Sequence, residues 1–368
     1  MSMYRYILVA LVGLALLVGS LLLAARPQAA ESTYEITWLG DTFLGDRGRQ
    51  LLDEKGYSAA FDRLPDIGAS DLTIINAEAP LTDLNILPAS RDIYYTKGST
   101  TPRYDIYTSR GKVTRYVHRS SPESATAFAQ AGVDGVTLAN NHAFDQGAQG
   151  MQDSIAVIRK TGMTPIGAGN DLREAMQPYV VDTPYGRVAI FAFGKEGGTV
   201  PAATVSTPGL LTLSSTNLDA TGALAKKADA KWKVAMVHWG RNYTNVDSQQ
   251  QKWAERFADR GFDLVVGTGP HVAQRIEIIK RTVVAYSLGN FVFQQRGRFT
   301  SSQEGYGLIL TTGLGPNGFR DVRVTCIDVD NKRVNYQPCA ASPADAARIL
   351  PRISSALTIN GAEGMFTW

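Results

Sequence analysis

The chain is poor in the residues from which zinc fingers and redox centres are built, and it carries little net charge. Among its 368 residues there are 2 cysteines and 4 histidines, and the formal net charge is +3. Two cysteines cannot provide zinc-finger spacing, and a charge this small does not by itself indicate a nucleic-acid-binding surface. P-loop and basic-region heptad patterns are also missing. We therefore expect no nucleic-acid partner, and the few histidines become the informative residues.

The two cysteines, Cys326 and Cys339, lie close together near the C-terminal end. In an oxidising compartment they could close a short loop between two strands. The alternative is that both remain unpaired thiols. No metal-binding or redox motif surrounds either of them.

Long apolar runs are missing except near the N-terminus. Residues 7–25 are all apolar or small, with Arg5 before them and Arg26 after them. This length nearly spans a bilayer as a helix and is long for the apolar part of a signal peptide. We expect residues 1–30 to be an uncleaved signal anchor and linker, with a cleaved signal peptide as the alternative. In both cases the body, residues 31–368, is exported; with the anchor it is held at the membrane on the extracytoplasmic side, periplasmic or at the cell surface.

Short apolar strands recur along the body, each ending in a polar motif and most of them followed by a helical pattern. This order predicts a layered α/β fold whose site lies at the carboxyl ends of the strands. Alternating runs after residue 305 indicate antiparallel strands. Five strand-end motifs can converge, and they contain Asp41, Asn76 with Glu78, Asn141 with His142, His238, and His271.

Carboxylate, asparagine and imidazole groups are the ligands of a divalent metal site, and two such metals can clamp the oxygens of a phosphoryl displacement. Asp41 and Glu78 would supply the negative charge that holds one or two cations of unspecified identity. Asn141, His238 and His271 would complete the coordination. Whether Asn76 or Glu78 is the ligand in its motif stays open.

The residue after Asn141 can point into the site without binding metal. His142 is therefore a candidate general acid for a leaving oxygen. Asp145, three residues further on, would orient His142 through its far nitrogen, and it could equally cap the following helix. Asn290 ends another strand and would either contact a ligand, as Asn76 would, or fix the loop beneath His271.

The segment 91–119 is an insertion rich in basic residues and tyrosines. It is either a solvated β-hairpin arm with tyrosines packed on its face or a platform for an anionic polymer or a phosphate-bearing lipid. In the second case Arg103, Arg110 and Arg115 would contact the substrate. His118 also lies here, and with no ligand motif around it we expect a structural role.

Six segments, in chain order, resemble the capsule synthesis protein CapA family, whose members act in poly-γ-glutamate capsule assembly and export. They are Gly40-Asp41, Asn76-Ala-Glu-Ala-Pro80, Ala139-Asn-Asn-His-Ala-Phe-Asp-Gln-Gly147, His238-Trp-Gly240, Gly267-x-x-Pro-His-Val-x-Gln274 and Tyr286-Ser-Leu-Gly-Asn-Phe-Val-Phe293. The family is similar to calcineurin-like metallophosphoesterases, which implies a four-layer α/β/β/α sandwich.

By this resemblance Asp41 matches the first metal-binding aspartate, and Asn141 with His142 matches the Asn-His pair. His238 matches the isolated metal histidine, and His271 the second histidine of the terminal His-x-His element. The chain departs from the pattern at Gly269, where family members often have histidine, and at Phe43, where phosphoesterases have another. The resemblance therefore predicts an incomplete two-metal site.

Two functions remain open at this point. The first is an exported metal-dependent hydrolase of a phosphoester or an amide-linked anionic polymer. The second is a non-catalytic factor that binds an anionic polymer beside a membrane synthase or export complex. A periplasmic nucleotidase-like enzyme is a third, weaker alternative.

Overall fold

The computed structural model describes residues 33–64, 66–87, 91–108, 111–195, 200–294 and 296–367. Within these residues no helix is long and apolar enough to cross a membrane. The expected anchor, residues 1–30, lies outside the described residues, and so does Arg110. The account that follows concerns the unit Tyr34–Trp368.

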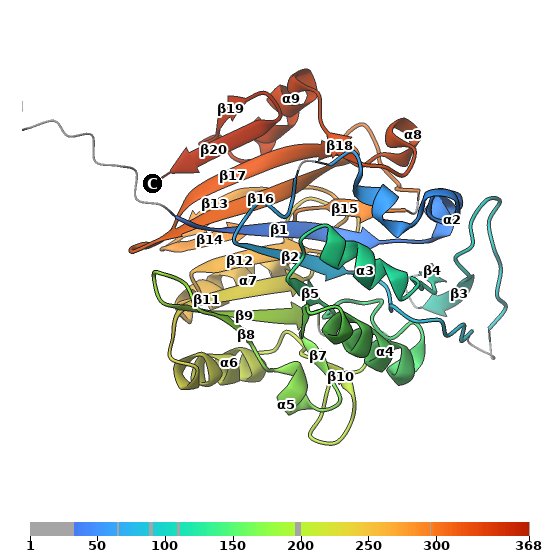
Figure 1. The fold of residues 1–368 in the computed structure, drawn as a ribbon, viewed down its shortest axis with the longest axis horizontal. Helices are drawn as coiled ribbons and strands as arrows, with labels where there is room; N and C mark the ends of the chain where they lie inside the picture. Colours follow the sequence, from blue (N-terminus) through green and yellow to red (C-terminus); the bar gives the residue numbers. More distant parts are fainter. Residues whose placement is uncertain are drawn as a thin grey trace, which may run out of the picture. The chain divides into compact units, whose positions relative to one another are not determined.

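Two sheets form the interior of this unit (Figure 1). The larger sheet has the order β19-β20-β17-β16-β1-β2-β5-β6, with β15 beside β1 and β18 beside β17. Its strands are β1 (Tyr34–Phe43), β2 (Leu72–Ala77), β5 (Gly135–Thr137), β6 (Thr164–Ile166), β15 (Asn290–Phe293), β16 (Tyr306–Gly315), β17 (Gly318–Asp328), β18 (Cys339–Ala340), β19 (Thr358–Asn360) and β20 (Glu363–Thr367). As expected from the sequence, the strands after residue 305 pair antiparallel.

The second sheet has the order β13-β14-β12-β11-β9-β8. Its strands are β8 (Tyr179–Val181), β9 (Arg187–Gly194), β11 (Ala230–His238), β12 (Leu264–Thr268), β13 (Ile276–Ile279) and β14 (Thr282–Ala285). Two small pairs stand apart from both sheets: the hairpin of β3 (Arg103–Thr108) with β4 (Gly111–Tyr116), and β7 (Ala168–Gly169) with β10 (Gly209–Leu210).

Helices cover the outer faces of both sheets. The helical segments are η1 (Asp46–Gly48), α2 (Arg49–Lys55), η2 (Tyr57–Phe61), α3 (Glu123–Gln130), α4 (Gly147–Lys160), α5 (Leu172–Ala175), α6 (Ser215–Lys227), α7 (Ser248–Asp259), α8 (Asn331–Val334) and α9 (Pro343–Ile353). Local signals set their ends: Asp247 and Gln250 form a capping box at the start of α7, and the Ser214 hydroxyl caps α6.

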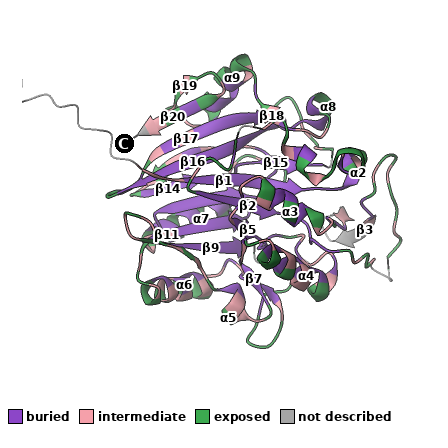
Figure 2. Cartoon of the chain, in the orientation of Figure 1, coloured by how far each residue is buried: buried purple, intermediate pink, exposed green. Residues whose placement is uncertain are grey.

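Three apolar cores separate four layers, and Figure 2 shows the strands buried between the helices. Between the sheets, Trp38 of β1 packs in one cluster with Ile190 of β9 and Val234 of β11. On the outer face of the larger sheet, Leu39 belongs to a cluster with residues of α2, α3 and α4, while α6 and α7 cover the second sheet. Successive residues of β1 thus face opposite cores, as the period of a strand dictates. The layers are helix, sheet, sheet, helix, which is the arrangement that the resemblance implies.

The cysteines remain unpaired: Cys326 is buried, Cys339 is partly exposed, and both are free thiols. The disulfide considered from the sequence is therefore wrong. The ladder explains why, because Cys339 on β18 lies opposite Asp328 of β17 rather than opposite Cys326.

Candidate metal centre

Neighbouring parallel strands of the larger sheet position the acidic residues of the site. At the carboxyl end of β1, Asp41 pairs in register with Asn76 on β2 and with Asn290 on β15. The register shifts between Leu39 and Asp41, which is a local irregularity of the kind that re-aims a side chain beside a functional site. Glu78 directly follows β2, and its backbone N–H donates to the Thr42 carbonyl at 2.8 Å.

The second sheet supplies the histidines. His238 ends β11 opposite Thr268, the last residue of the parallel strand β12, and His271 follows three residues later. His271 holds a left-handed backbone conformation, with φ of 60°, which is uncommon for a residue with a side chain and is often found at functional sites. Because the sheets pack face to face, the ends of β1, β2, β11 and β12 meet, and the site contains groups from both sheets.

Asp41 is fully buried and closely surrounded. Its carboxylate accepts hydrogen bonds from the Asn76 side-chain amide at 2.9 Å and from the Gly269 backbone N–H at 3.0 and 3.2 Å. His271 Nδ1 lies 3.2 Å and His238 Nδ1 3.6 Å from its oxygens. Burial on its own would raise the pKa of Asp41, but His271, His238 and the Gly269 amide hold that pKa below its usual value. Asp41 is therefore kept as an anion.

Glu78 has no such support. Both of its carboxylate oxygens are buried without a hydrogen-bond partner. Oε1 lies 3.6 Å from His271 Nε2 and 3.7 Å from His238 Nε2. Burial, and next the charge of Asp41, raise the pKa of Glu78 well above its usual value. A buried carboxylate without a partner is costly, and such groups are normally paired or bind a metal.

Asp41, Glu78 and His271 form a group that can hold one divalent cation, and His238 lies beside Glu78 as a fourth candidate. Oxygen and nitrogen ligands at about 2.1 Å from an ion lie roughly 3.0 to 3.4 Å from their neighbours in octahedral or tetrahedral arrangements. The Nε2 atoms of His271 and His238 lie 3.6 and 3.7 Å from Glu78 Oε1, slightly beyond that spacing, whereas the contacts of the same rings with Asp41 are made by Nδ1. Ligand atoms of Asp41, Glu78 and His271 all lie within 4.8 Å of one another. The two acidic residues and two histidines are thus the groups that would hold a metal.

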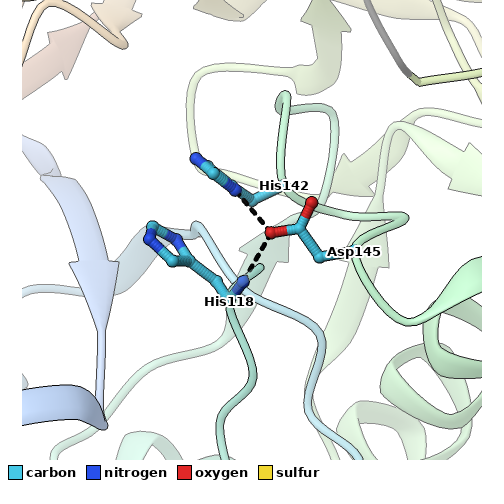
Figure 3. A group of neighbouring side chains, drawn as sticks. All are labelled: His118, His142 and Asp145. Atoms are coloured by element: carbon cyan, nitrogen blue, oxygen red, sulfur yellow. Dashed lines mark hydrogen bonds and ion pairs between the residues drawn. The ribbon is translucent and has the colours of Figure 1, made fainter. Parts of the chain in front are cut away.

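A second group contains His142, Asp145 and His118 (Figure 3). Asp145 Oδ2 accepts a hydrogen bond from the His118 backbone N–H at 2.6 Å and shares a second one with His142 Nδ1, also at 2.6 Å. These contacts fit the expectation that Asp145 orients His142. The Asp145 side chain does not cap the next helix, because Gln146 occupies the cap position of α4 without a side-chain hydrogen bond. Desolvation by burial raises the pKa of Asp145 to about 7 and lowers that of His142 to about 3.

His118, which we expected to have a structural role, lies beside His142. Its ring is buried and stacks between Phe43 at 4.4 Å and His142 at 3.8 Å, measured between ring centroids. The planes of the two imidazoles differ by only 21°, so their in-plane nitrogen lone pairs do not converge on one ion. We therefore interpret His118 as packing that holds His142. Nothing in the sequence around His118 signals this contact, which depends on the arm returning to β1.

Two asparagines at strand ends, Asn76 and Asn290, support ligand candidates of the site. Asn76 is 1% exposed, and both ends of its side-chain amide are hydrogen-bonded within the site. Its NH₂ group donates to Asp41, and its Oδ1 accepts from the Thr137 hydroxyl at 3.2 Å and from the Asn140 side-chain amide at 3.1 Å. It therefore positions Asp41 and is not free to contact a substrate, contrary to our expectation. Asn290 Oδ1 lies 3.0 Å from His271 Nδ1 and fixes that imidazole, one of the two roles considered for it.

Asn141 is exposed, whereas its neighbour Asn140 is buried and donates to the Ala77 carbonyl at 2.7 Å. Asn141 lines a cavity of about 250 Å³ together with His238, Gly269, Arg115 and Lys195. Of the arm residues predicted to contact substrate, Arg115 thus reaches the site. Arg103 instead lies over the Tyr116 ring at 4.7 Å, within the β3–β4 hairpin. No sequence pattern points to Lys195 or distinguishes the role of Asn140 from that of Asn141.

Comparison with known proteins identifies relatives over most of the chain. Residues 35–295 match the family model described as bacterial capsule synthesis protein PGA_cap. The PGA biosynthesis protein CapA of Bacillus subtilis (strain 168) is 29% identical over 304 residues, which cover 82% of this chain and 73% of that protein. The capsule biosynthesis protein CapA of Bacillus anthracis is 27% identical over 335 residues, 89% and 74% of the two chains.

Proposed function

Because the chain belongs to the bacterial capsule synthesis protein family PGA_cap, we propose that it assists the synthesis of a polyglutamate-type capsule polymer as a metal-dependent hydrolase. The substrate is an anionic polymer or its phosphate-bearing precursor. The protein acts on the extracytoplasmic side, held at the membrane by the segment at residues 1–30 and working beside a membrane synthase or export complex.

One observation carries the hydrolase proposal: the two unpartnered oxygens of Glu78 beside two imidazoles. A cation held by Glu78, Asp41, His238 and His271 removes the cost of leaving that carboxylate without a partner. When bound, such an ion supplies Lewis-acid chemistry to a phosphoryl or carbonyl oxygen.

The remaining chemistry belongs to the side chains around the ligands. In hydrolysis the oxygen of water bonds to phosphorus or to the carbonyl carbon, the bond to the leaving oxygen or nitrogen breaks, and the leaving atom takes up a proton. His142 can give that proton from Nε2 while its Nδ1, 2.6 Å from Asp145, accepts the proton of the protonated Asp145 carboxyl; the proton lost by the attacking water replaces it. Stacking on His118 fixes the plane of the ring, and Arg115 and Lys195 in the cavity wall attract an anionic substrate.

The test combines metal analysis with turnover. Purified full-length protein is compared with Glu78→Gln and with Glu54→Gln, the same change on α2 where Glu54 is exposed. We expect bound metal and hydrolysis of glutamate polymers or phosphoesters in the wild type and in Glu54→Gln, and loss of both in Glu78→Gln. Equal metal content in all three proteins would refute the site. Preference for nucleotides over polymers would favour a nucleotidase.

A second candidate function is a non-catalytic polymer-binding factor, and one contact favours it. The Gly269 backbone N–H donates to both oxygens of Asp41, at a position where family members often provide a histidine side chain. Asp41 thereby gains a partner that needs no second metal. If metal-free protein binds glutamate polymer as tightly as the metal-loaded form and neither hydrolyses it, this function replaces the first.

A further inference from the structure

The cavity at the candidate metal centre continues into a larger one. The cavity of about 250 Å³ beside His238 shares Lys195, Trp239 and Gly240 with a cavity of about 540 Å³. The smaller cavity alone is below the range of about 300 to 1,000 Å³ that is usual for drug-sized ligands. Because these three residues line both cavities, the two lie next to each other beside the metal centre, and we call them together the groove.

Cations lie along this groove at intervals. Arg115 lines the smaller cavity, Lys195 stands where the two cavities join, and Arg241 lines the larger one. The Lys195 ammonium is held at the junction by donating to the Gly240 carbonyl at 3.1 Å, and its backbone N–H donates to the His238 carbonyl at 3.0 Å. The Arg241 side chain is 70% exposed, with only a 3.6 Å contact to Asp247. The charge pattern is complementary to a chain with repeated negative groups.

The larger cavity also has an apolar part. Trp253 and Leu213 line it, Trp253 is partly exposed, and the Arg256 guanidinium lies 4.6 Å from the Trp253 ring centroid. An aromatic face suits methylene groups, whereas the lysine and arginines suit carboxylates. A polycarboxylate whose charges are separated by methylene groups matches both features, and a polyphosphate matches only the charges.

We propose that the groove binds an internal stretch of a linear polycarboxylate chain, which passes Lys195 and extends along Trp253 and Arg241. The bond to be cleaved then lies within the chain and not at its end. This inference rests on the proposed function for the statement that a bond is cleaved. Its own content is how the polymer is bound, and binding measurements alone test it.

The test measures the affinity of the full-length protein for a glutamate dimer and a glutamate decamer by calorimetry. We expect the decamer to bind more tightly, and Arg241→Ala to weaken the decamer about fivefold while leaving the dimer unchanged. Trp253→Ala acts in the same direction. The matched control is Lys226→Ala, which removes one exposed positive charge from α6 away from either cavity and should change neither affinity.

Arg241 is mostly exposed, so its substitution tests the groove even if Trp253→Ala fails to fold. Unchanged decamer affinity in Arg241→Ala would overturn the proposal, as would tighter binding of a polyphosphate of equal length. Turnover in the same preparations separates the two proposals. If binding depends on Arg241 but no turnover occurs, the hydrolase proposal fails and the groove proposal stands. If turnover occurs and neither Arg241→Ala nor Trp253→Ala changes it, the groove proposal fails and the hydrolase proposal stands.

Discussion

Replacing Gly269 by alanine should strongly destabilise the protein, although the change adds a single methyl group. Gly269 has φ of +107°, and a β-carbon built there would lie 2.6 Å from the Trp239 carbonyl oxygen and 3.2 Å from His238 Nε2. Its backbone N–H also donates to both oxygens of the buried Asp41. Moving the backbone to relieve the contact with Trp239 would lengthen those hydrogen bonds.

Two separate effects set the size of the expected loss of stability in Gly269→Ala. A side chain in a sparsely populated backbone conformation costs about 1 to 3 kcal/mol, and an extra carbon forced into a packed site costs about 1 to 3 kcal/mol. We therefore expect a loss of roughly 2 to 6 kcal/mol in the free energy of unfolding, a large share of the roughly 5 to 15 kcal/mol that a folded protein has. Gly269→His, which introduces the histidine that the family resemblance implies at this position, should be at least as destabilising and should not add a metal ligand.

Denaturant unfolding of the metal-free protein measures this loss. Gly222→Ala is the matched control, because Gly222 lies within α6 and nothing occupies the space of its β-carbon within 4 Å. Alanine there should stabilise the protein by up to about 1 kcal/mol. If Gly269→Ala costs less than about 1 kcal/mol, the backbone at Gly269 is not constrained as described, and a histidine there would be tolerated.

Three further outcomes are expected. Removing metal with a chelator should lower the free energy of unfolding, by about 2.7 kcal/mol if the metal had been present at 100 times its dissociation constant. Scanning calorimetry before and after metal is added back measures this change. An unchanged melting temperature would count against a bound ion. Asp145→Asn should reduce turnover about ten- to a hundredfold with metal content unchanged, because it alters the group that orients His142; full activity would remove Asp145 from the mechanism. Alkylation of the unfolded, unreduced protein should label both Cys326 and Cys339, and mass spectrometry that finds neither labelled would show a disulfide.

Much of the layer arrangement could be predicted from local patterns. The spacing of apolar residues over 249–260, followed by Gly261, predicts a helix there, and the structure has α7 at Ser248–Asp259. Apolar spacing also predicts a helix over residues 218–230, but α6 lies three residues earlier, at Ser215–Lys227. Ser214 starts it, and Asp229 takes a left-handed conformation before β11 begins. Neither effect is visible in the apolar spacing alone.

The convergence of Asp41, Glu78, His238 and His271 could be predicted because the carboxyl ends of parallel strands share an edge. The hydrogen-bond partners of those residues could not be predicted from the sequence. Asn76 and Asn290 are polar residues at strand ends like the others, and only the packed structure shows that they serve Asp41 and His271. The stacking of His118 on His142 joins segments that have no pattern in common.

The position of β1 in its sheet also determines when the site can exist during folding. Its neighbours are β2, with Trp38 opposite Ile74, and β16, with Trp38 opposite Leu310 on the other side. Asp41 is likewise bordered by Asn290. Contacts between residues so distant in sequence form late and slowly, because the entropy cost of closing a long loop comes before the contacts can stabilise the chain. A growing chain that already contains all four candidate ligands still has β1 unpaired along one edge, so cation binding should report completed folding and not assist its early steps.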